Sequence, residues 1–164
     1  MKKTQKLSLL AMTVAVAMLL SFIESRLPAF TAIPGVKIGL ANIAVMFALY
    51  RFGAKEAALV SLVRVVLISL LFGSLVSMLY GLCGGAVSLL FMTILKRFSP
   101  LSPLGVSVAG GVAHNAAQIG VACMILGTAR ITYYLPFLIL SGTLSGIAVG
   151  ICAAILIKRI KFKP

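Results

Sequence analysis

The sequence predicts an all-α membrane protein: a bundle of six transmembrane helices, with both ends of the chain in the cytoplasm, in a single domain over residues 1–164. Composition and length predict it. Apolar side chains make up 62% of the chain, which is more than a water-soluble core of this size uses. A hydrocarbon core about 30 Å thick needs about 20 apolar residues per helix. Six such helices with their loops therefore account for the 164 residues.

Long apolar runs predict where the six helices lie. In chain order they are residues 7–23, 36–50, 56–72, 75–95, 104–127 and 134–157. The breaks between these runs contain residues that favour turns, namely Pro28, Pro34, Gly35, Gly53, Gly73, Pro100, Pro103 and Gly127. The second run crosses the membrane only if Lys37 extends its side chain toward the membrane surface.

The basic residues predict the orientation of the bundle. In the six-helix arrangement eleven of them fall on one side: Lys2, Lys3, Lys6, Arg51, Lys55, Lys96, Arg97, Lys158, Arg159, Lys161 and Lys163. The other side receives only Arg26, Lys37 and Arg130. Because the basic side of a membrane protein faces the cytoplasm, we expect both termini there, in a bacterial inner membrane. The charges are dispersed among helix ends, so we expect contact with membrane lipid and no binding of nucleic acid.

The acidic residues and cysteines exclude several kinds of chemistry. Glu24 and Glu56 are the only acids, and the chain contains no Asp. It therefore has no Asp-rich magnesium motif, and it also lacks a glycine-rich phosphate loop for nucleotides. Three separated cysteines, Cys83, Cys123 and Cys152, indicate neither a disulfide framework nor a zinc site. We expect no metal, no cofactor and no prenyl-transfer catalysis.

Arg64 lies near the middle of the third apolar run, close to the membrane midplane. A charged side chain there costs about 2.5–3.5 kcal/mol on insertion scales, so it needs a partner or a cavity. One interpretation is a structural arginine bonded to helix ends or carbonyl groups. The other is an anion-binding group in a cavity open to the outside. The scarcity of carboxylates favours a bound substrate as the negative partner.

Three polar residues of the fifth run share one helix face, since Gln118 lies four positions after His114 and three after Asn115. That face must point into the bundle, because polar groups facing lipid are costly. The side chains either bond neighbouring helices or form one wall of a ligand pocket. Asn42, in the second run, is expected at a similar depth.

The connection from Glu24 to Lys37 is the longest on the outer side and contains Arg26, Pro34 and Gly35. The two prolines and the glycine stiffen it, so it is either a lid over a cavity or a well-packed loop. Ala11 and Ala15 are four positions apart in the first helix. Such small residues permit close packing with another helix, either of this chain or of a second membrane subunit.

Four stretches together resemble one family of small membrane proteins. They are residues 34–43 (PGVKIGLANI), 64–67 (RVVL), 81–88 and 107–118, and the last ends in HNAAQ. The chain resembles the heptaprenyl diphosphate synthase component I family, also called the Gx transporter family, over nearly its whole length. Its six-helix plan, first loop and Ala11/Ala15 pair are also similar to the substrate-binding S components of energy-coupling-factor vitamin transporters.

These resemblances imply two functions. The first is a substrate-binding transporter subunit for a small anionic metabolite, working with a coupling subunit and ATPases. In it Arg64, His114, Asn115, Gln118, Asn42 and Lys37 bind the substrate, Glu24, Arg26, Pro34 and Gly35 form the lid, and Ala11 and Ala15 dock a partner. The alternative is a non-catalytic membrane accessory of heptaprenyl diphosphate synthesis that holds a lipid-like substrate or a soluble prenyl synthase.

Overall fold

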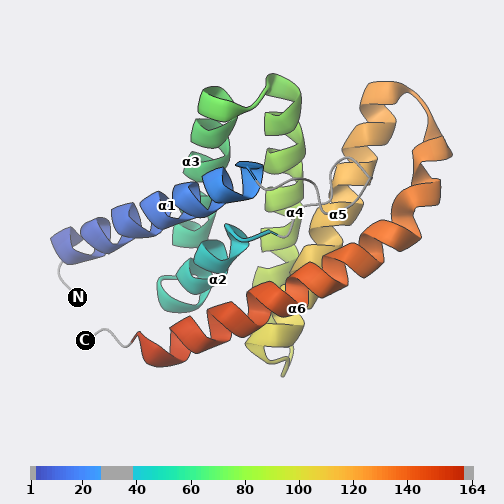
Figure 1. Cartoon of the computed structure of the whole chain (residues 1–164). Helices are drawn as coiled ribbons and strands as arrows, with labels where there is room; N and C mark the ends of the chain where they lie inside the picture. Colours follow the sequence, from blue (N-terminus) through green and yellow to red (C-terminus); the bar gives the residue numbers. More distant parts are fainter. Residues whose placement is uncertain (1–2, 27–38, 161–164) are drawn as a thin grey trace.

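The structure, a computed structural model, describes residues 3–26 and 39–160 and is helical throughout its regular elements. Figure 1 shows their arrangement. The elements are α1 (Lys3–Arg26), α2 (Asn42–Arg51), α3 (Ala54–Phe72), α4 (Leu75–Phe98), α5 (Pro103–Leu126), the 3-10 helix η1 (Ala129–Tyr134) and α6 (Leu135–Arg159). The predicted all-α class with six α-helices is therefore confirmed.

Four helical segments are long and apolar enough to cross a membrane: α1, α4, α5 and the continuous stretch of η1 and α6. The chain is thus a multi-pass integral membrane protein. The helix α3 has 19 residues but carries three charged side chains, Lys55, Glu56 and Arg64. In so short a helix these charges fall within any stretch long enough to cross the membrane, whereas the charges of α1 lie at its two ends.

The predicted second helix, residues 36–50, is confirmed over residues 42–50, but its start was placed too early. Residues 36–38 lie outside the described residues, and α2 begins only at Asn42. Gly39 has a positive φ of 77°, and the amide of Asn42 donates to its carbonyl oxygen at 2.8 Å. These residues form a turn because glycine adopts that conformation without steric cost. With 10 residues, α2 is about 15 Å long and too short to cross the bilayer by itself.

Helix ends follow from local chemistry at the other breaks. Ser74 and Ser77 form a capping box at the start of α4, and Ser102 precedes Pro103 at the start of α5. Gly127 ends α5 in the left-handed conformation. The two serine caps accept bonds from backbone amides that a helix start leaves unpaired. The predicted boundaries of α4 and α5 lie within three residues of those observed because these signals are local.

Helices α3, α4 and α5 run roughly side by side, and α1 and α6 cross them obliquely (Figure 1). The helix α4 packs against both α3 and α5, while α6 packs against α5 and α2. Glycines bring α5 and α6 together, since a Cβ on Gly142 would lie 2.8 Å from the carbonyl oxygen of Gly111. Such close backbone contact is typical of helices in membranes.

One end of the bundle is held together by basic side chains, and we call it the basic end. Lys6 of α1 pairs with Glu56 at the start of α3. Arg51 donates to the carbonyl oxygen of Ile157 in α6, and Lys96 donates to that of Leu49 at 2.7 Å. These contacts bring the beginnings of α1 and α3 together with the ends of α2, α4 and α6. The opposite end is the cavity end.

Candidate functional site

A cavity of about 810 Å³ lies toward the cavity end of the bundle. Its walls come from α1, α3, α4, α5, η1 and the first turn of α6, together with the start of α2. The polar and charged side chains that line it include Glu24, Asn42, Arg64, Tyr80, His114 and Gln118. Its volume is within the range of small-molecule sites, about 300–1,000 Å³. The structure therefore brings together five of the residues singled out in the sequence.

Arg64 is 9% exposed and lies in the wall of this cavity. Its Nη2 donates a long hydrogen bond of 3.5 Å to Oδ1 of Asn42. Its Nε has no hydrogen-bond partner among the described residues. A buried guanidinium has five donors, and an unmade bond to a buried charged group costs free energy. Arg64 is thus left with capacity to bind a further acceptor.

Glu24 joins the end of α1 to the start of α2. Its carboxylate accepts a hydrogen bond from the amide of Gly39, and it also attracts Arg64 electrostatically. The two side chains make no ion pair, since Lys6 with Glu56 is the salt bridge found within the described ranges. Glu24 therefore reduces the positive charge of the cavity without covering the guanidinium.

Glycines of α4 make room for the side chains that face the cavity from both neighbouring helices. A Cβ on Gly84 would lie 2.8 Å from Cε1 of His114, which reaches across from α5. A Cβ on Gly81 would lie 2.8 Å from a methyl group of Val65 in α3. The glycine stretch therefore determines how near His114 and α3 lie to α4.

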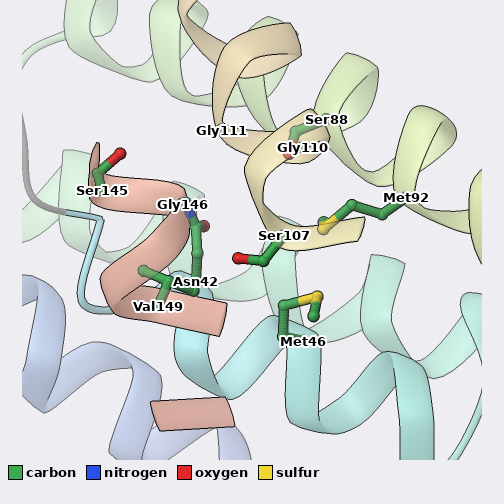
Figure 2. A pocket seen from close by; sticks show the side chains of 10 residues that line it. All are labelled: Asn42, Met46, Ser88, Met92, Ser107, Gly110, Gly111, Ser145, Gly146 and Val149. Carbon is green, nitrogen blue, oxygen red and sulfur yellow. The ribbon is translucent and has the colours of Figure 1, made fainter. Parts of the chain in front are cut away.

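Asn42 also borders a second, much smaller cavity between α2, α4, α5 and α6. This cavity has a volume of about 20 Å³, which is enough for about one water molecule. Figure 2 shows Ser107 and the sulfur atoms of Met46 and Met92 around it. Ser88 and Ser107 are both buried in its wall. Asn42 thus separates the large cavity from a small polar space.

Several predicted site residues lie elsewhere. Asn115 does not line the large cavity; its Nδ2 donates to the carbonyl oxygen of Leu138 at 2.8 Å and so joins α5 to α6. Arg26 is exposed and lies over the ring of Phe22. Ala11 and Ala15 are exposed on the outer face of α1. Lys37, Pro34 and Gly35 lie outside the described residues, so their roles in binding and in the lid stay predictions.

The sequence analysis missed the apolar part of the cavity. Ile68 and Phe72 of α3 line it four and eight positions after Arg64, and Leu126 lines it eight positions after Gln118. Their helical spacing from Arg64 and Gln118 is the sequence signal that could have identified these apolar residues, because residues four positions apart share a helix face. Tyr80 and Tyr134 add aromatic surface to the same cavity.

The described part of the chain holds no group of three His, Cys, Asp or Glu side chains placed to bind a metal ion. Cys83, Cys123 and Cys152 are all free thiols. The side chains that line the cavity offer hydrogen bonds, charge attraction and apolar contact to a ligand.

The fold and the cavity define a multi-pass helical membrane protein with a buried arginine facing an internal cavity. A family model matches residues 13–156 of the chain, and its description is heptaprenyl diphosphate synthase component I. The chain belongs to that family, as the resemblance in its sequence indicated. Comparisons with curated proteins and with solved structures found no match.

Proposed function

We propose that the protein is the substrate-binding membrane subunit of a transporter for a small anionic metabolite, similar in role to an S component. The observation that supports it is Arg64, which is 9% exposed and faces a cavity of about 810 Å³. Its Nε is without a partner in the described part of the chain. An anion in the cavity supplies the counter-charge that the guanidinium lacks, and charge-assisted hydrogen bonds are stronger than those between neutral groups.

In this proposal Arg64 neutralises the anion, and Asn42, His114 and Gln118 orient it by hydrogen bonds. Glu24 fixes the mouth of the cavity through its bond to the amide of Gly39. The basic end faces the cytoplasm by the positive-inside rule, so the cavity end faces outward. The substrate then enters from the outer side, and partner ATPases with a coupling subunit supply the energy for its release inward.

The test is the Arg64→Ala variant, with Arg97→Ala as its control because Arg97 is exposed at the basic end. Small molecules that co-purify with the wild-type protein in mild detergent are identified by mass spectrometry and then titrated against each variant. We expect Arg64→Ala to lose affinity by about tenfold or more while remaining folded. Unchanged affinity in purified, folded Arg64→Ala protein contradicts the proposal.

A second function is favoured by the family description itself. In it the protein is a non-catalytic membrane accessory of heptaprenyl diphosphate synthesis, and it holds a soluble prenyl synthase or its lipid-like substrate at the membrane. Affinity purification under mild conditions separates the two functions. Stoichiometric recovery of an ATPase with a coupling protein supports transport, whereas stoichiometric recovery of a prenyl synthase supports the accessory role.

A further inference from the structure

Along α3 and α5 the wall of the large cavity passes from charged and amide side chains at depth to mainly apolar side chains toward the end of the bundle. Along α3 its wall passes from Arg64 to Ile68 and Phe72, and along α5 it passes from His114 to Gln118 and Leu126. Both helices run from the basic end to the cavity end, so the two gradients point in the same direction. Eight helical positions correspond to about 12 Å along the axis. A ligand of that length has its polar group deep in the bundle and its apolar part near the mouth.

Few charged side chains line the large cavity. Arg64 supplies one positive charge, and Glu24 lines the same cavity with one negative charge that attracts it. The described residues offer no cluster of metal-binding side chains to add positive charge. Glu24 makes no ion pair with Arg64 within the described ranges, so the guanidinium keeps one positive charge that a single anionic group can offset, and uncompensated charge is costly in a low-dielectric site. A diphosphate carries more charge than one arginine offsets.

Apolar and aromatic side chains form much of the outer part of the wall, beside the hydroxyl groups of Ser69 and Ser77. Besides Ile68 and Phe72, the apolar side chains include Leu126 and Ile131. Phe72 also packs against Phe22 with ring centroids 5.0 Å apart, so this wall is continuous with α1. Burying an apolar body here removes its surface from water, which favours binding in proportion to the area covered.

We propose that the ligand is an amphipathic monoanion, a carboxylate on an apolar body, bound with the carboxylate at Arg64 and Asn42 and the apolar part against Ile68, Phe72 and Leu126. This inference rests on the proposed ligand-binding function and names its substrate class. The proposal also excludes prenyl diphosphates as ligands of this cavity. If the protein has the accessory role, it holds a prenyl diphosphate at a place other than Arg64.

The test uses four probes: geranate, geraniol, geranyl diphosphate and acetate. The first three share one branched apolar chain and differ in the head group, while acetate is the carboxylate without the chain. Each is equilibrated near neutral pH with protein in nanodiscs, and binding to empty nanodiscs is subtracted. The Arg64→Gln variant is compared with Arg97→Gln, which removes an exposed arginine at the basic end.

We expect geranate to bind about tenfold or more tightly than each of the other three probes, and Arg64→Gln to remove that advantage while Arg97→Gln keeps it. Preferred binding of geranyl diphosphate that depends on Arg64 overturns the monoanion and leaves the anion-binding function intact. Equal binding of geranate and geraniol, unaffected by Arg64→Gln, overturns both. Binding of acetate as tightly as geranate overturns the apolar body alone.

Discussion

At the scale of single residues, the burial of Arg64 is the feature that most needs a physical explanation. Insertion of an arginine at the centre of a membrane helix costs about 2.5–3.5 kcal/mol. One long bond of 3.5 Å to Asn42 recovers little of this, because hydrogen bonds weaken at that distance. The cavity beside the guanidinium gives access to water or to a ligand, and Glu24 adds electrostatic attraction. The burial of Arg64 beside a cavity thus supports the proposed binding site.

His114 provides a prediction at the same scale. A Cβ on Gly84 would lie within 3.0 Å of three atoms of the His114 ring. Those atoms belong to a side chain that can rotate, so we expect Gly84→Ala to leave the protein folded and to move the imidazole away from its place in the cavity. Ligand affinity should fall several-fold with little change in Tm, as measured by titration and by thermal unfolding in detergent.

The control for this variant is Gly120→Ala on α5, because no atom lies within 4 Å of a Cβ at that position. It adds the same methyl group to a helix without disturbing a neighbour. If Gly84→Ala and Gly120→Ala bind the ligand equally well, His114 does not contribute to binding from its present position.

At the scale of helices, the contact between α5 and α6 depends on glycine. The sequence showed Gly142, Gly146 and Gly150 at four-residue spacing, but it gave no sign that Gly111 is their partner on α5. A Cβ on Gly111 would collide with the carbonyl oxygen of Gly142. Pairing of this kind depends on which faces meet in three dimensions, and periodicity within one helix does not determine that.

We therefore expect Gly111→Ala to separate α5 from α6 and to destabilise the protein by about 1–3 kcal/mol, the usual cost of overpacking. Backbone atoms cannot rotate away as the His114 ring can, so the substitution lowers the free energy of unfolding. The variant should show a Tm several degrees lower, whereas Gly120→Ala should match or slightly exceed the wild type because alanine favours helix. A Gly111→Ala protein with wild-type Tm contradicts this close contact.

Helix positions were predictable wherever the breaks have local causes. Ser74 and Ser102 begin helices through bonds to their own neighbours, Gly127 ends one through its left-handed backbone, and the predicted limits of α4 and α5 are close to those observed. The start of the second helix was predicted too early because apolar composition continues through Gly39 and Leu40, while the backbone turns there. Hydropathy reports burial in the membrane and does not distinguish a helix from a buried turn.

At the scale of the whole molecule, the polar half of the cavity was predictable and the apolar half was not. Charged and amide side chains in apolar runs are rare, so Arg64, Asn42, His114 and Gln118 stood out, and all four line one cavity. Ile68 and Phe72 resemble every other apolar residue of the chain. Asn115 stood out equally yet bonds Leu138, because adjacent residues on a helix point in different directions.

The basic end gives the last prediction, which concerns orientation. Lys6, Arg51 and Lys96 make contacts at one end of the bundle, and the cavity lies toward the other. The positive-inside rule predicts that the basic end is cytoplasmic. Single cysteines are introduced at Lys158, in the last turn of α6, and at Ala129, the first residue of η1, after Cys83, Cys123 and Cys152 are replaced by alanine. Both new positions are exposed.

In intact cells a membrane-impermeant maleimide should label Ala129→Cys and leave Lys158→Cys unlabelled until the membrane is permeabilised. Labelling of Lys158→Cys in intact cells reverses the orientation, and the cavity then faces the cytoplasm.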